Sequence, residues 1–215
     1  MMKLHVFAIA PNGAKVRLYL AEKAHAGSKI ELEEITVNLV EGQQKSLAFL
    51  AMNPFGKIPV LELDDGRVIY ESLAIIEYLE ELYPETSLWG PDPESRGYAR
   101  QIERIADAQG LIAIAREIHS TNSPIGLPAN PEVAKYHRQL WETGMGHLEE
   151  MLQDGRPYLA GERVTVGDCT LQGALQFARF ADLDVLKNFP RLRSWCDRFR
   201  QRPTVEGVIF SKRSR

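Results

Sequence analysis

Apolar runs of strand length and stretches with helical spacing alternate along the N-terminal part of the chain. Two stretches have helical spacing: one from after the Pro-Asn-Gly turn at 11–13 to about residue 26, and one that begins at residue 72. A stretch over 41–52, first polar and then apolar, predicts a short irregular helix. A strand–helix–strand unit followed by a hairpin and a helix is typical of a mixed sheet flanked by helices. The four apolar runs that predict strands cover residues 4–9, 30–39, 58–63 and 67–70.

The first strand and helix have distinct burial patterns. Residues 4–9 are apolar on both faces, which predicts a central, buried strand. In the helix that follows, Val16 and Leu20 are one turn apart and predict its buried side. We expect Arg17, Glu22 and Lys23 to face solvent, because charged side chains are rarely buried.

A proline-rich stretch divides the chain. Residues 84–93 hold three prolines and one glycine, which predicts a linker and a domain boundary. The fold class predicted is α+β with two domains: a βαβ-ββα domain over 1–83, the linker, and an all-α domain over 94–215. The helical patterns beyond the linker cover residues 94–120, 131–152, 169–183, 189–200 and 203–210.

Composition narrows the classes of function. The 215 residues carry a net charge of −3, which gives no electrostatic case for nucleic acid or an acidic membrane surface, and no apolar run is long enough to cross a membrane. Two cysteines, Cys169 and Cys196, make neither a disulfide framework nor a zinc site, and their scarcity fits a reducing cytoplasm. The five histidines lack metal-ligand spacing, so no metal site is expected. Basic residues 212–215 are expected to be a solvated end.

One stretch, Asn53–Ser72, combines turn, strand, hairpin and helix-start signals. Pro59 falls where a strand should begin to pair, so it marks a strand start or a special turn, including a cis one. Asp65 and Gly66 supply the conformations that a tight hairpin needs. Ser72 opens a helix, where free backbone N–H groups and the helix dipole favour a carboxylate.

The motif NPFGKIPVL, followed by ESLAIIEYL, resembles the glutathione-binding half of the cytosolic glutathione transferase superfamily. The opening VFAIAPNGAKVRLYLAEK resembles the family's first strand and helix, and YLAGERVTVGDCTL resembles the start of a late helix in its second domain. The resemblance covers nearly the whole chain. It implies a thioredoxin-like first domain, glutathione as co-substrate without a metal, and a homodimer in the cytoplasm.

The resemblance also assigns residues to the parts of glutathione, a peptide with two carboxylates, one ammonium and one thiol. Ser72 and Glu71 would meet the γ-glutamyl end, the Ile58 backbone the cysteinyl part, and Lys57 with Gln44 the glycyl carboxylate. Taken singly, each has a plain structural explanation as a helix cap, a solvated loop charge or a surface residue. The glutathione-binding candidates implied are Gln44, Lys57, Ile58, Pro59, Glu71 and Ser72.

Activation of the thiol points to Asn12. Most branches of the family place Tyr, Ser or Cys near the end of the first strand, but residues 1–14 contain none of these and no Thr. The sequence PNGxKV resembles the bacterial nu-type and prion-type nitrogen-regulator branch, in which an asparagine faces the sulfur, often with a threonine where this chain has Ala10. Asn12 is thus the catalytic candidate, although an asparagine also caps helices and makes turns without chemistry.

The expected reaction is conjugation of the glutathione thiolate to small, mostly apolar electrophiles. Glutathione-dependent reduction of disulfides or peroxides and a non-catalytic binding or scaffold role remain alternatives. Cys169 and Cys196 are expected to be packing residues, and Thr165 with Asp168 a helix capping box. The acceptor pocket is expected between the domains, against the long helix after the linker. An apolar face on such a helix is more often simply part of the core. The acceptor-site candidates on that face are Ile105, Gln109, Ile112 and Arg116.

Overall fold

The computed structural model describes residues 1–210, and it contains one four-stranded sheet. The strand order is β2-β1-β3-β4, with β1 parallel to β2 and antiparallel to β3. The β3–β4 hairpin is antiparallel and pairs Leu61 with Ile69. β1 is therefore an inner strand, as its apolar sequence predicted. The strands are β1 (Met2–Val6), β2 (Leu32–Thr36), β3 (Val60–Glu62) and β4 (Val68–Tyr70).

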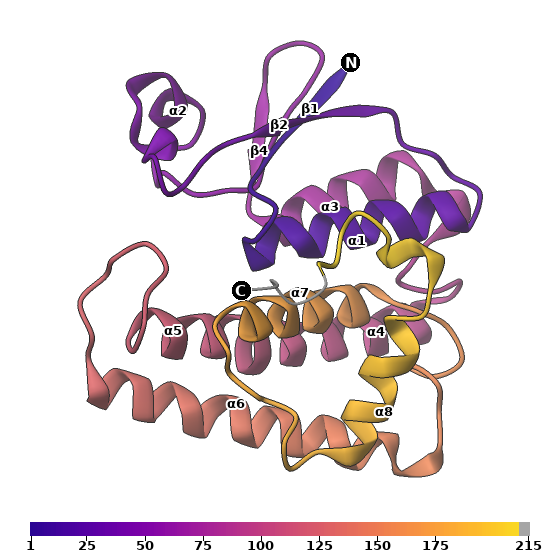
Figure 1. Cartoon of the computed structure of the whole chain (residues 1–215). Helices are drawn as coiled ribbons and strands as arrows, with labels where there is room; N and C mark the ends of the chain where they lie inside the picture. Colours follow the sequence, from indigo (N-terminus) through magenta and orange to yellow (C-terminus); the bar gives the residue numbers. More distant parts are fainter. Residues whose placement is uncertain (211–215) are drawn as a thin grey trace.

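Helices cover both faces of this sheet (Figure 1). On one face, Val16 of α1 and Ile76 of α3 belong to one apolar cluster with Leu4 of β1. On the other face, Phe49 of α2 packs with Val60 of β3, because successive strand residues point to opposite sides. The thioredoxin-like layout of the first domain is thereby confirmed. The helices of this part are α1 (Pro11–His25), α2 (Leu47–Met52) and α3 (Ser72–Leu82).

The second part of the described chain is all-α. Its central helix, α7, is buried along nearly its whole length, and Leu171 of α7 packs in one cluster with Met145 of α6 and Trp195 of α8. Thr165 and Asp168 form the predicted capping box at the start of α7, and Asp168 also accepts a hydrogen bond from the indole of Trp195 at 2.8 Å. The helices are α4 (Pro93–Ile105), α5 (Ala113–His119), α6 (Pro131–Met151), α7 (Val166–Phe180) and α8 (Pro190–Phe199).

The two parts share a close interface, because α7 lies against α1 (Figure 1). A Cβ added at Gly173 of α7 would lie 2.7 Å from the carbonyl oxygen of Pro11. Lys15 of α1 is completely buried, with its Nζ 2.6 Å from a carboxylate oxygen of Glu103 and 3.6 Å from one of Asp107. Close packing and a buried ion pair therefore fix α1 against the helical part.

Several sequence predictions need correction. The continuous helix expected over 94–120 is interrupted by a π-helical segment, Ala106–Ile112, between α4 and α5. The helix expected over 203–210 is only a 3₁₀ turn at Pro203–Val205. Glu22 and Lys23 were expected to face solvent, but both are buried because α1 is enclosed by the sheet, α7 and the C-terminal segment.

The predicted linker packs tightly. Leu88 and Trp89 are buried in the apolar cluster of the sheet part, so this stretch is fixed on the first domain. Its place as a domain boundary over 84–93 stays a prediction. The basic residues 212–215, predicted to be a solvated end, lie outside the described residues.

Candidate active site

Two candidate residues from distant parts of the sequence meet where α1 and α3 begin. The hydroxyl of Ser72 donates a hydrogen bond to the side-chain oxygen of Asn12, at 2.9 Å. Ser72 is buried and Asn12 is half-buried. Because the amide oxygen of Asn12 accepts this bond, its N–H₂ group is left to donate elsewhere.

Both helix starts favour an anion. Neither α1 nor α3 has an acidic residue in its first turn or a side-chain hydrogen bond at its N-cap within the described chain. The first N–H groups of a helix have no partner inside the helix, and the dipole makes this end positive. Two such ends at one place therefore form an anion-binding position.

A rigid loop leads into β3 beside these helix starts. The Ile58–Pro59 peptide bond is cis, as the sequence allowed, and Pro59 is buried. Asn53 holds the loop: its side-chain amide donates to the carbonyl of Lys57 at 2.7 Å, and its oxygen accepts from the N–H of Phe55 at 3.1 Å. The backbone of Ile58 is thus presented by a supported turn.

The candidates for the glycyl carboxylate differ in exposure. Lys57 is exposed, whereas Gln44 is 8% exposed. The side-chain oxygen of Gln44 is buried and has no hydrogen-bond partner among residues 1–210. A buried amide oxygen without a donor is unusual in folded proteins and is consistent with a ligand position, at which a carboxylate would bond to the N–H₂ group of the same side chain.

Glu71 has a strained backbone. Its φ of 72° lies in a region that residues other than glycine rarely adopt. Such strain is common at functional sites, where the surrounding structure maintains it. The Glu71 side chain is exposed directly before α3, where its negative charge can meet an ammonium group.

The four acceptor candidates lie in different settings along the helix after the linker. Ile105 ends α4 and packs against the core of the helical part. Gln109 lies in the π-helical segment, with its Cβ only 2.4 Å from where a Cβ on Gly144 of α6 would be. Ile112 is 42% exposed and Arg116 is exposed. Their role at an acceptor site stays a prediction.

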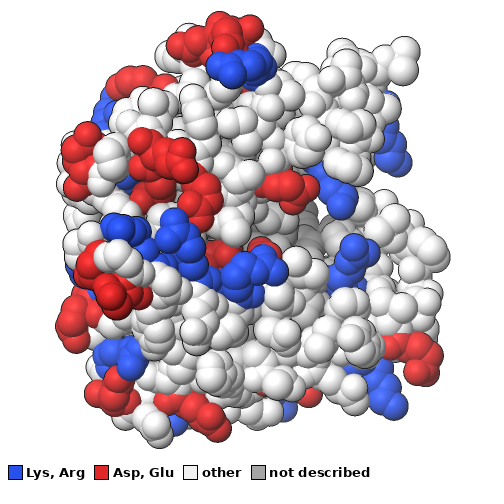
Figure 2. All heavy atoms as spheres, turned by 180° about the vertical axis from the view of Figure 1, so that it is seen from behind, with Lys and Arg blue, Asp and Glu red and all other residues white. Residues whose placement is uncertain are grey.

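Arg116 adds charge near two histidines. Burial, together with the nearby Arg116 guanidinium, lowers the pKa of His119 and of His137 below the ordinary value. Figure 2 shows a hollow between the sheet part and the helical part, with Lys or Arg side chains on both of its sides. Asp or Glu side chains also border the hollow, so its surroundings suit a ligand that carries charges of both signs.

Sequence reasoning missed two contributors to this region. Asn53 was interpreted only as a turn residue, although its side chain holds the loop before Ile58. Ile9, just before α1, packs against the core of the helical part and so lies at the junction of the two parts. The contact of Ile9 is distant in sequence, so only the three-dimensional arrangement reveals it. The bonds of Asn53 reach residues two and four positions on, and an asparagine before a turn is a local signal that could have indicated them.

No group of three or more His, Cys, Asp or Glu side chains within residues 1–210 could hold a metal ion. In the same range, no helix combines the length and hydrophobicity needed to span a bilayer.

Two family models match the chain. The model described as "Glutathione S-transferase, N-terminal domain" matches residues 4–87, and the one described as "Glutathione S-transferase, C-terminal domain" matches residues 98–198. Both halves of the chain are thus matched, in the order that the fold requires.

Individual proteins agree with these models. The chain is 33% identical over 207 residues to glutathione S-transferase 2 of Saccharomyces cerevisiae, covering 93% of this chain and 85% of that protein. The crystal structure of Gtt2 from the same organism superimposes with a TM-score of 0.86 at 32% identity, over 96% of this chain and 99% of that one. A maleylacetoacetate isomerase of Pseudomonas aeruginosa is 37% identical over 103 residues, 47% of this chain and 46% of that protein.

Proposed function

This chain belongs to the glutathione S-transferase family, and we propose that it joins the thiolate of glutathione to small, mostly apolar electrophiles. Glutathione is the co-substrate of this reaction. The observation that carries the proposal is the hydrogen bond between Ser72 and Asn12, 2.9 Å long, at two uncapped helix starts. It connects the position suited to a carboxylate with the only side chain of the first helical turn that can donate to sulfur.

Glutathione would lie along the supported loop and the start of α3. Its γ-glutamyl carboxylate would accept bonds from free N–H groups of the first turn of α3, and Glu71 would meet its ammonium. The hydroxyl of Ser72 already donates its hydrogen to Asn12, so its part is to orient that amide. The cysteinyl part would pair with the backbone of Ile58, next to cis-Pro59. Lys57 and the buried Gln44 would receive the glycyl carboxylate.

The energy needed to form the thiolate is within reach of this arrangement. A free thiol has a pKa of about 8.5, and lowering it by ~2 units requires ~2.7 kcal/mol of preferential stabilisation of the thiolate. A hydrogen bond to a charged group contributes about 1.5–3 kcal/mol, and a helix N-terminus about 0.3–1 kcal/mol. The amide of Asn12 and the start of α1 together could supply this stabilisation of the thiolate.

Paired assays test the proposal against reduction by glutathione. Conjugation to a chloronitrobenzene and reduction of a glutathionylated disulfide are measured with wild type, Asn12→Ala and the control Asn188→Ala, whose side chain is exposed on the helical part. We expect conjugation in wild type, a loss of roughly ten- to hundredfold in Asn12→Ala, and no change in the control. Reduction without conjugation would instead assign the alternative activity, and glutathione binding without either activity would indicate a scaffold role.

We also propose that the protein is a cytoplasmic homodimer, as the resemblance implies. Exposed apolar side chains of the sheet part, including Leu47 at the start of α2 (88% exposed) and Phe55 in the loop before β3 (64% exposed), are consistent with a protein contact there. Sedimentation velocity should give about twice the 24.3 kDa of one chain. A single species of one-chain mass at micromolar concentration would contradict it.

A further inference from the structure

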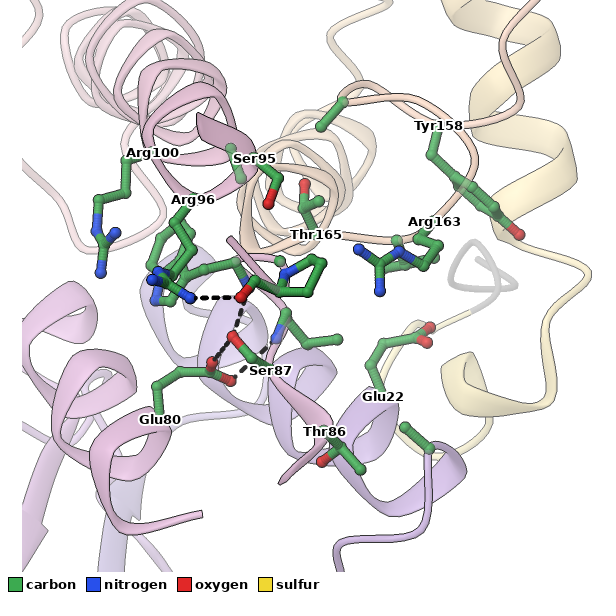
Figure 3. A pocket seen from close by; sticks show the side chains of 18 of the residues that line it. Glu22, Glu80, Thr86, Ser87, Ser95, Arg96, Arg100, Tyr158, Arg163 and Thr165 are labelled. Carbon is green, nitrogen blue, oxygen red and sulfur yellow. Dashed lines mark hydrogen bonds between the residues drawn. The ribbon is translucent and has the colours of Figure 1, made fainter. Parts of the chain in front are cut away.

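A second cavity lies at the opposite ends of the two helices that begin at the candidate active site. It has a volume of about 930 Å³ and is lined by the C-terminal halves of α1 and α3, the stretch 84–91, the first turns of α4 and the loop 158–165. None of the glutathione-binding candidates lines it. We name it the linker cavity; Figure 3 shows it from close by.

Half of the ten Glu and Arg side chains on its walls are already in ion pairs. Glu22 binds Arg202 with a carboxylate oxygen 2.6 Å from the guanidinium, and Glu80 lies 3.4 Å from the buried ammonium of Lys23. Glu77 pairs with Arg100 at 3.3 Å. The charges of these groups cancel locally and add little net field inside the cavity.

Two arginines remain without a carboxylate partner in the described part of the chain. Arg96 donates to the carbonyl oxygen of Pro91 at 2.9 Å, a neutral acceptor, and Arg163 has no hydrogen bond or ion pair to any of residues 1–210. Figure 3 shows Arg96 and Arg163 on opposite sides of the cavity, with the guanidinium group of Arg96 directed at the Pro91 oxygen and that of Arg163 directed inward. Guanidinium groups bind carboxylate and phosphate oxygens in pairs, because their donors form a planar fork.

The remaining acidic residues lie at the edge of the linker cavity. Glu81, Glu85 and Glu162 line the cavity but are exposed, as Arg163 is, so water and salt screen these charges more than that of the half-buried Arg96. They favour a ligand whose anionic head points inward and whose outer end is neutral or positive.

The inner wall also holds donors that lack acceptors. The indole N–H of Trp89 is buried and has no hydrogen-bond partner among residues 1–210, and Trp89 as a whole is only 2% exposed. The hydroxyl of Thr86 is likewise buried and without a partner in that range. Buried polar groups in folded proteins nearly always have a hydrogen-bond partner, so these two groups are exceptions in residues that line the cavity, and both atoms lie just beneath its accessible surface.

We propose that the linker cavity binds a small molecule with an oxyanion head, a carboxylate or a phosphate, held between Arg96 and Arg163. Its volume is within the range of pockets that hold small molecules and far exceeds the size of a single water.

Isothermal titration calorimetry tests the site with two probes, inorganic pyrophosphate and citrate, at low salt. The variants are Arg96→Gln/Arg163→Gln, the charge-preserving Arg163→Lys, and the control Arg193→Gln, which removes an arginine that pairs with Asp184 outside the cavity. We expect saturable binding of at least one probe below about 1 mM, weakened roughly tenfold or more in the double variant. Arg163→Lys should weaken binding less, and the control should bind as wild type does.

The two probes distinguish the sources of the oxyanion: tighter binding of pyrophosphate assigns a phosphate ligand, and tighter binding of citrate a carboxylate one. No saturable heat with either probe, or equal affinity in wild type and the double variant, would overturn the proposal. Glutathione binding, measured in the same double variant, should equal that of wild type. Failure at the linker cavity therefore says nothing against the glutathione site, and the two proposals can fail separately.

Discussion

The contact between Ser72 and Asn12 gives a specific role to a hydroxyl. In the proposed site the hydroxyl orients the amide of Asn12 and the backbone N–H receives the carboxylate, so Ser72→Ala should lower kcat and leave KM for glutathione nearly unchanged. One neutral hydrogen bond is worth about 0.5–1.5 kcal/mol, so we expect a loss of roughly two- to tenfold in kcat. Steady-state kinetics measure both constants.

Ser194→Ala is the matched control, because Ser194 is an exposed serine on α8 that bonds only to its own helix. A rise in KM at unchanged kcat in Ser72→Ala would mean that the hydroxyl binds glutathione directly, and the orienting role would be wrong.

Glu62 makes stability depend on pH. Its carboxylate accepts hydrogen bonds from His5 at 3.0 Å and from Lys3 at 3.2 Å, and these contacts hold its pKa below the ordinary 4.5. A lowered folded-state pKa contributes stability above pH 4.5, and this contribution is lost as the pH falls through the folded-state value. Partly exposed pairs of this kind contribute less than about 1 kcal/mol.

Urea unfolding from pH 6 down to pH 3 checks this dependence. The free energy of unfolding should fall more steeply below pH 4.5 in wild type than in Glu62→Gln. Glu33→Gln, at an exposed position on β2, should behave as wild type. Parallel curves for wild type and Glu62→Gln would show that the contacts with His5 and Lys3 are energetically silent.

The sequence predicted single residues better than contacts between them. Asn12 and Ser72 were each placed at a helix start, but nothing in the sequence showed that they bond across 60 positions. The burial of Glu22 and Lys23 could not be predicted for the same reason: their partners, Arg202 and Glu80, come from other elements. Local patterns report spacing along one element, whereas these contacts depend on how elements pack.

At the scale of elements, α7 fixes the start of α1. In Gly173→Ala the new Cβ would lie 2.7 Å from the Pro11 carbonyl oxygen and 3.2 Å from the Lys15 nitrogen, so α1 or α7 must move. Overpacking typically costs about 1–3 kcal/mol. We expect a loss of stability in that range in urea unfolding, together with lower activity, because Asn12 lies in the displaced turn.

Gly146→Ala is the matched control for this substitution. Gly146 lies within α6 with no atom within 4 Å of an added Cβ, so alanine should stabilise by roughly 0.5–1 kcal/mol through helix propensity. If Gly173→Ala were as stable as Gly146→Ala, the close approach of α7 to α1 would be wrong.

The buried pair of Lys15 and Glu103 joins α1 to α4. Removing one charge leaves the other buried without compensation, which costs about 3–5 kcal/mol, so Lys15→Met should strongly destabilise the fold. Replacing both residues, as in Lys15→Met/Glu103→Leu, should recover most of this loss, because an apolar pair can fill the same space. Denaturant unfolding of wild type, the single variant and the double variant measures their free energies of unfolding. A double variant no more stable than the single one would show that the pair does not act as a unit.

The elements themselves were largely predictable, but their interruptions were not. Helical spacing predicted one helix over 94–120, whereas the structure inserts the π-helical segment Ala106–Ile112. There Gln109 sits against Gly144 of α6, and this packing has no signature in local periodicity. The start of α7 was better determined, because the Thr165–Asp168 capping box is a local signal and is present in the structure.

At the scale of the whole molecule, α1 and α3 link two separate regions. Their N-terminal ends meet at Asn12 and Ser72, and their C-terminal ends line the linker cavity. A family resemblance in the sequence predicted the fold class and the candidate active site. The family models confirm the resemblance at the level of the superfamily. The linker cavity had no counterpart in the sequence, because its walls come from segments that are far apart along the chain.

The central claim is that Asn12, oriented by Ser72, stabilises the thiolate of bound glutathione. Ultraviolet absorbance of the thiolate, titrated against pH with glutathione saturating, measures the pKa of the bound thiol directly. The account predicts a value roughly 2 units below the free thiol's 8.5 in wild type, and a return of about 1–2 units toward 8.5 in Asn12→Ala. A wild-type value equal to that of free glutathione, or the same lowered value in Asn12→Ala, would contradict it.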